Sequence, residues 1–245
     1  MKKGILLGLG LIMAFFTTSC TFSETIVINE NGSGKVSFDI DGSGLMAMAG
    51  DKMAEDGEKR IDSSFTFKEL LAEKADSISK LPKEEQARLK SLERFTVKML
   101  VDPASKEMTI NMFADFDKAD NLQDMMNLFG NMSNMNKKAG QPDMGGLFQN
   151  GSEVTYKYDG KKFVRGVKMV DKPKKKDEEG DEEMYKAMFG ESNYQLNYTF
   201  PKKVKKVSNK NAVISADKKT VTLTYPLSEF FDNPKAMALD VEFEK

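Results

Sequence analysis

The sequence of 245 residues contains no histidine, no tryptophan and a single cysteine. Without histidine there is no imidazole to act as a general base, to complete a Ser-His-Asp triad or to bind zinc. The one thiol, at Cys20, cannot form an intramolecular disulfide bond. These absences exclude most familiar enzyme mechanisms, and we expect a protein without catalytic activity, cofactor or bound metal.

An excess of charge of either sign is also missing. The chain has 37 Lys and Arg residues and 38 Asp and Glu residues, which gives a formal net charge of -1. Proteins that bind nucleic acid have a strong basic excess on one face, so we do not expect nucleic acid as a partner. Hydrophobic residues make up 40% of the chain, which is enough to form one packed core.

The amino terminus has the pattern of a secretory signal. Lys2 and Lys3 precede an uncharged run at residues 4–16 and small residues at 17–19, directly before Cys20. The uncharged run is shorter than the roughly 20 residues that a membrane-spanning helix needs. The arrangement resembles a bacterial lipoprotein signal, which implies cleavage before Cys20 and acylation of its thiol. An ordinary cleaved signal with an incidental cysteine is the alternative.

The residues after Cys20 give an expected location. Thr21 stands where many such lipoproteins have the aspartate that retains them in the inner membrane, so the resemblance implies the outer membrane. No acidic export cluster follows, which favours the periplasmic side. We expect the first strand to begin near Glu24, so that residues 20–23 form a tether of roughly 14 Å at full extension. The membrane is therefore an expected partner, through the lipid anchor.

Most of the remaining chain alternates apolar and polar residues, which is typical of antiparallel strands with one buried face. Turn residues at 31–34, 102–103 and 159–160 predict three hairpins. Three more strands are expected near the carboxyl terminus, at 194–200, 221–225 and 237–243.

Helical periodicity and composition predict the segments between these strands. The expected helices cover 66–80, 82–93, 119–136 and 182–189, and the expected loops cover 137–152 and 171–183. The fold class is α+β: a curved, mainly antiparallel sheet of about eight strands, partly closed and covered by helices, in one domain over residues 24–245.

Two stretches resemble a known family. Residues 24–34 follow the cysteine with the sequence ETIVINENGSG, and residues 198–201 (YTFP) with 220–226 lie near the carboxyl terminus. Together they resemble the LppM-type bacterial lipoprotein domain and its relatives in Bacteroidota. The resemblance implies a curved antiparallel sheet with helices packed against it, and binding of amphiphiles at a membrane. It implies no catalytic residue.

Methionine is abundant, and several methionines have helical spacing within residues 119–136. The residues that could bind an amphiphile are Met125, Met126, Phe129, Met132 and Met135. They fit best in the core of the domain, because methionine fills irregular gaps, and they also fit an adaptable apolar surface for lipid. Copper(I) binding by Met132 and Met135 is a third interpretation.

A basic patch follows Pro201. It consists of Lys202, Lys203, Lys205 and Lys206. Such a patch is either a solvated strand end or a contact for acidic lipid headgroups, which a domain held at the membrane would meet.

These observations favour a lipid-anchored periplasmic binding or interaction protein without catalysis, whose partner is a lipid, another amphiphile or a protein. Two alternatives are an amphiphile carrier with an open half-barrel, and a hydrolase that uses paired carboxylates or a Ser-Lys dyad.

Overall fold

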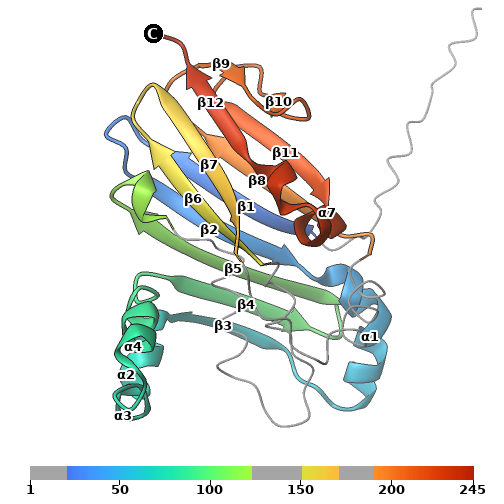
Figure 1. Ribbon diagram of the computed structural model, residues 1–245. Helices are drawn as coiled ribbons and strands as arrows, with labels where there is room; N and C mark the ends of the chain where they lie inside the picture. Colours follow the sequence, from blue (N-terminus) through green and yellow to red (C-terminus); the bar gives the residue numbers. More distant parts are fainter. Residues whose placement is uncertain (1–20, 123–150, 171–189) are drawn as a thin grey trace, which may run out of the picture.

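The computed structural model describes residues 21–122, 151–170 and 190–245, and these residues form two β-sheets with short helices (Figure 1). In spatial order, sheet A contains β10 (Val213–Ile214), β11 (Thr220–Pro226), β8 (Asn193–Thr199), β1 (Thr21–Ile28), β2 (Gly34–Asp41), β5 (Glu107–Phe116), β4 (Thr96–Asp102) and β3 (Ile61–Thr66). Sheet B contains β6 (Ser152–Tyr158), β7 (Lys162–Met169), β12 (Leu239–Phe243) and β9 (Val204–Val207).

The strand pairs are antiparallel with one exception, the central pair of β1 and β8 in sheet A. These two strands run in the same direction, with Thr21 opposite Asn193 and Val27 opposite Thr199. Parallel strands need a long connection between them, and here most of the chain lies between the two. The parallel pair brings the beginning of the described chain beside its carboxyl-terminal third.

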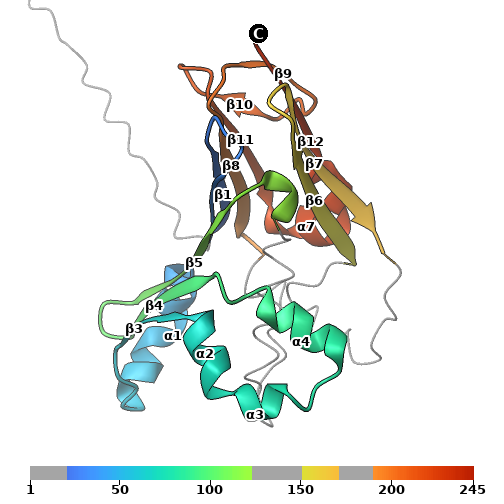
Figure 2. The same ribbon diagram turned by 90° about the vertical axis from the view of Figure 1, so that its left-hand side faces the viewer.

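The core lies between sheet B and the part of sheet A formed by β11, β8, β1 and β2 (Figure 2). Apolar residues alternate along these strands, so one face of each sheet is buried. Aromatic rings fill the space: the Phe163 ring lies 5.3 Å from that of Tyr198 and 5.2 Å from that of Phe200, measured between centroids. Helix α7 (Leu227–Asp232) adds Phe230, whose ring packs edge-on against Tyr194.

Strands β5, β4 and β3 extend sheet A beyond sheet B (Figure 2). Helix α1 (Ser43–Glu55) packs against β5, and α2 (Phe67–Glu73), α3 (Ala75–Ile78) and α4 (Lys83–Lys90) follow β3. Thr66 and Glu69 cap α2 reciprocally: each side chain accepts a hydrogen bond from the backbone N–H of the other residue. The described residues also contain the 3-10 helices η1 (Ala119–Asn121) and η3 (Pro234–Met237). Among the described residues, no helix is long and apolar enough to cross a membrane.

Several sequence predictions are confirmed. The fold is α+β, its largest sheet has eight mainly antiparallel strands, and the three predicted hairpins are β1–β2, β4–β5 and β6–β7. The turn at residues 159–160 has Gly160 at a φ of 80°, as a tight hairpin turn requires.

Other predictions are wrong. Sheet A is open and not partly closed, and a second sheet, which the sequence did not indicate, covers half of it. The first strand begins at Thr21 and not near Glu24, because Phe22 continues the inward alternation and the buried Glu24 interrupts its apolar character. The helix predicted at 66–80 is divided at Lys74 into α2 and α3.

Some elements were not predicted, and some predictions lie outside the described residues. The missed elements include β3, β9, β10 and α7. Of the helix predicted at 119–136, the structure describes only residues 119–122, which contain η1. The helix at 182–189 lies outside the described residues, as do nearly all of the two predicted loops.

Candidate functional site

A carboxylate is buried between the two sheets. Glu24 of β1 is 1% exposed, and its Oε1 accepts hydrogen bonds from the hydroxyls of Tyr198 at 2.6 Å and Tyr156 at 2.7 Å. Its Oε2 accepts a third from the Tyr194 hydroxyl at 2.8 Å, and Arg165 Nη2 lies 3.7 Å from the same oxygen. These five residues form what we call the Glu24 cluster.

Strand alternation directs the Glu24 cluster into the core. Glu24, Tyr194 and Tyr198 occupy inward positions of sheet A, while Tyr156 and Arg165 occupy inward positions of sheet B. Arg165 Nη1 also donates to the backbone carbonyl of Met237 at 3.1 Å, at the end of η3. Within the described residues, Arg165 Nε has no hydrogen-bond partner. The cluster therefore joins the two sheets through the Glu24–Arg165 ion pair and the hydrogen bond from Tyr156, while Tyr194 and Tyr198 bind Glu24 from its own sheet.

Burial and neighbouring charges shift the pKa values of three side chains in the Glu24 cluster. It raises the pKa values of Tyr156 and Tyr198 well above their ordinary value near 10, and the negative charge of Glu24 raises them further. Burial opposes the charge of Arg165, but Tyr198 and Glu24 outweigh this effect and raise the Arg165 pKa above its usual range. Both tyrosines thus remain neutral hydrogen-bond donors, and this arrangement stabilises the contact between the sheets.

A second region of high charge density lies on the surface, in residues 200–220. This segment contains seven lysines and one acidic residue, Asp217. All seven lysine side chains are exposed: Lys202, Lys203, Lys205, Lys206, Lys210, Lys218 and Lys219. The segment also contains the exposed aliphatic residues Val213 and Ile214, which are 66% and 37% exposed. We call these seven lysines, with Val213 and Ile214, the basic end.

Buried residues fix the backbone of the basic end while its lysines extend into solvent. Phe200 and Val204, 1% and 2% exposed, hold the chain where it passes from β8 in sheet A to β9 in sheet B. Lys202 Nζ donates to the Gly160 carbonyl at 3.0 Å, and Lys218 Nζ lies 3.3 Å from a Glu244 carboxylate oxygen. The other five lysines form no ion pair with any residue that the structure describes, so their charge is available to a partner.

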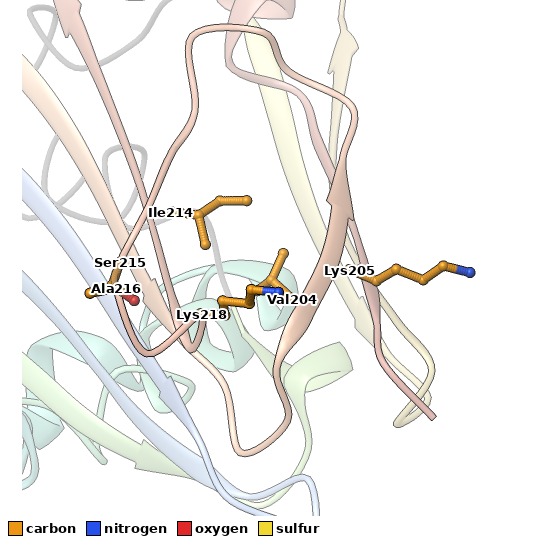
Figure 3. A pocket seen from close by; sticks show the side chains of 6 residues that line it. All are labelled: Val204, Lys205, Ile214, Ser215, Ala216 and Lys218. Carbon is orange, nitrogen blue, oxygen red and sulfur yellow. The ribbon is translucent and has the colours of Figure 1, made fainter.

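A shallow hollow of about 320 Å³ lies between the part of this segment that contains β9 and the part that contains β10 (Figure 3). Val204 of β9 and Ile214 of β10 line it from its two sides, and Lys218 reaches into the same space. Lys205 points away from the hollow into solvent. Aliphatic surface therefore lies directly beside the ammonium group of Lys218, which is paired with Glu244.

The four lysines predicted to contact headgroups are all exposed, and they form part of the basic end. The predicted lipidation site and the predicted amphiphile-binding residues lie outside the described residues: Cys20, Met125, Met126, Phe129, Met132 and Met135. In the described ranges, no group of three or more metal-binding side chains comes together.

Sequence reasoning missed the Glu24 cluster, although a signal was present. In β1 the residues Phe22, Glu24, Ile26 and Ile28 alternate inward, so a carboxylate takes a core position in an apolar series. It also missed the lysines and aliphatic residues after position 206, because only the pairing of β10 with β11 brings them to the same end.

No protein-family model and no curated protein matches the chain. Among solved structures, the chain is similar to the NMR structure of the folded domain of the Mycobacterium tuberculosis LppM protein, with a TM-score of 0.34 and 9% sequence identity. The likeness covers 92% of this chain and 91% of that one. Similarity at this level says nothing of ligand or activity.

Proposed function

We propose that the protein is a lipid-anchored, non-catalytic docking protein of the bacterial outer membrane, and that its basic end binds anionic lipid headgroups. The observation that carries this proposal is the exposure of seven lysines against a single aspartate in residues 200–220. A lysine close to an anionic bilayer contributes about 1 kcal/mol of attraction. A cluster of this size is sufficient for measurable binding.

The chemistry of the basic end supports a bilayer as its partner. Five of its lysines have neither an ion pair nor a side-chain hydrogen bond among the described residues, so binding breaks few existing interactions. Val213 and Ile214 offer aliphatic side chains beside these charges, as proteins that bind at the headgroup level do. A bilayer surface supplies both complements, namely acidic phosphate groups and apolar chains beneath them.

The amino terminus supplies the anchor in this proposal. Strand β1 begins at Thr21, one residue after Cys20, so acyl chains on that thiol would hold the domain at the membrane with almost no linker. Stable membrane attachment generally takes two signals, and two acyl chains meet this requirement. We place the protein on the periplasmic side.

Flotation with lipid vesicles tests the headgroup contact. The protein is the chain from residue 20 onward with Cys20→Ser, so that no acyl chain contributes, and it contains every described element. We expect it to float with phosphatidylcholine vesicles that contain phosphatidylglycerol and not with phosphatidylcholine alone. Binding should disappear in about 1 M salt, where the Debye length is about 3 Å.

Two matched variants locate the contact. The basic variant carries Lys202→Gln, Lys203→Gln, Lys205→Gln and Lys206→Gln. The control variant makes the same change at four exposed lysines around α2, α3 and α4: Lys68→Gln, Lys74→Gln, Lys80→Gln and Lys83→Gln. We expect the basic variant to bind at least about 30-fold more weakly, as two lysines at about 1 kcal/mol each would produce, and the control variant to bind normally. Equal loss in both variants would contradict the proposal.

A further inference from the structure

The two ends of β1 lie beside oppositely charged surfaces. At its first residue, Thr21 is opposite Asp41, the last residue of β2. At its other end, Val27 is opposite Thr199, and the chain continues from Thr199 directly into the basic end. The two surfaces are separated by the eight residues of β1, about 25 Å at about 3.3 Å per residue.

The segment that begins at Asp41, opposite Thr21, is acidic. Residues 41–58, which run from the end of β2 through α1, contain five exposed acidic residues and one lysine, Lys52. The acidic residues are Asp41, Asp51, Glu55, Asp56 and Glu58. We call them the acidic segment. Only Asp51 forms an ion pair with a described residue, to Lys106 at 2.9 Å. Figure 1 shows α1 far from β9 and β10.

Between these two ends, three strands of sheet A carry no charge on their outward face, and the neighbouring β2 carries one charge of each sign there, Lys35 and Asp39. On the three neighbouring strands β11, β8 and β1, the outward positions hold hydroxyl, amide and two apolar residues: Thr21, Ser23, Thr25, Val27, Asn193, Gln195, Asn197, Thr199, Thr220, Thr222, Thr224 and Pro226. The hydroxyl and amide groups bond one another across strands, as Thr222 Oγ1 does to Asn197 Oδ1 at 3.1 Å. A face on which the few charges balance gives an anionic bilayer no electrostatic reason to draw the domain flat onto it.

We propose that the protein bridges two membrane surfaces, anchored to one at Cys20 and docked on the other, an anionic bilayer, by its basic end. This inference rests on the proposed function. The chain leaves the anchor at the acidic end of β1, where an anionic membrane repels the acidic segment. The lysines stand at the opposite end, so they face away from the membrane that holds the chain.

Vesicle capture tests the bridge, and the chain offers a specific means, because Cys20 is its only thiol. The chain from residue 20 onward is coupled through Cys20 to phosphatidylcholine vesicles that contain a maleimide lipid. Dye-filled vesicles with phosphatidylglycerol are then added, and co-sedimentation of the dye is measured. We expect at least about tenfold more capture than with dye-filled phosphatidylcholine vesicles, reversal in about 1 M salt, loss in the basic variant and retention in the control variant.

Two results separate the bridge from the proposed function. If the Cys20→Ser chain floats with anionic vesicles but the coupled chain captures none, the bridge is wrong and the headgroup contact stands. If the Cys20→Ser chain does not float, the headgroup contact is wrong and the bridge falls with it.

A further pair of substitutions distinguishes a bilayer from a soluble polyanion. Val213→Ser with Ile214→Ser should weaken vesicle capture several-fold while binding to heparin, a polyanion without apolar chains, stays unchanged. An equal effect on both, or none on either, would overturn the assignment of a bilayer as the partner.

Discussion

Charged side chains occur in two opposite surroundings in this molecule. In the Glu24 cluster, Glu24 and Arg165 are 1% and 2% exposed, and three tyrosines donate hydrogen bonds to the carboxylate. On the basic end, seven lysines extend into solvent, and five of them have neither an ion pair nor a side-chain hydrogen bond among the described residues. The charges of the Glu24 cluster are satisfied by partners within the fold. Most charges of the basic end have no partner among the described residues and can bind another molecule.

The difference separates stability from binding. Removing one member of a buried ion pair leaves the other unpaired in a medium of low polarity, which costs several kcal/mol. Removing an exposed lysine costs little, because water replaces its interactions. Substitutions in the Glu24 cluster should therefore alter unfolding, and substitutions in the basic end should alter binding.

The largest effect is expected from Glu24→Ala. It leaves the Arg165 guanidinium and three tyrosine hydroxyls without their common acceptor, so the free energy of unfolding should fall by about 3 to 5 kcal/mol. Urea denaturation measures the loss. The matched change Glu153→Ala, at an exposed position of β6, should stay within about 0.5 kcal/mol.

A double variant sharpens this prediction. Glu24→Leu with Arg165→Met removes both charges, so it should cost less than the sum of the two single changes. Additive losses would show that Glu24 and Arg165 do not act as a pair.

The next effect is a loss of stability in alkali. Because the pKa values of Tyr156 and Tyr198 are raised in the folded protein, both phenols ionise more readily after unfolding. Their contribution is complete below pH 10 and is lost as the pH rises above it, by about 1.4 kcal/mol per pH unit for each tyrosine. Unfolding free energies measured across this range should show a slope that Tyr156→Phe reduces. An unchanged slope in that variant would contradict the assignment.

A smaller effect is expected at Gly160, the turn residue whose carbonyl accepts a hydrogen bond from Lys202. Its φ is 80°, and an added Cβ would contact nothing within 4 Å, so the penalty of Gly160→Val is one of backbone conformation alone. We expect a loss of about 1 kcal/mol. Thermal unfolding of the neighbouring variant Lys161→Val, which should change by less than about 0.5 kcal/mol, provides the comparison.

The smallest effect on stability is expected from the basic variant. Its four lysines are exposed, and none forms an ion pair with a described residue, so the free energy of unfolding should change by less than about 0.5 kcal/mol. Urea denaturation alongside the control variant checks this. A loss above about 2 kcal/mol would mean that these lysines support the fold, and it would remove the separation between stability and binding.

The parts of the fold that local chemistry determines could be predicted from the sequence. Alternation and turn residues gave the three hairpins, because each strand of a hairpin meets its partner a few residues away. Alternation shows which face of a strand is buried but not which strand pairs with it. The parallel pair of β1 and β8 and the whole of sheet B depend on partners far along the chain, so the sequence did not indicate them.

The two parts of the candidate site differ in the same respect: the lysine patch could be predicted from the sequence, and the Glu24 cluster could not. The lysines from 202 to 206 are adjacent in the sequence, so their patch could be recognised directly. The three tyrosines that bond Glu24 are 132, 170 and 174 residues away from it, and no spacing rule connects them. Lys218 and Ile214 line the same hollow as Val204 only because β9 and β10 come together in the fold.

Hydrogen exchange of the Cys20→Ser chain, measured by mass spectrometry with and without phosphatidylglycerol vesicles, tests most directly where the membrane contact lies. We expect slower exchange in residues 200–220 when vesicles are present. Exchange in the acidic segment and in β1, which carries Glu24, should not change. Protection of residues 41–58, or binding without any protection of residues 200–220, would contradict docking by the basic end.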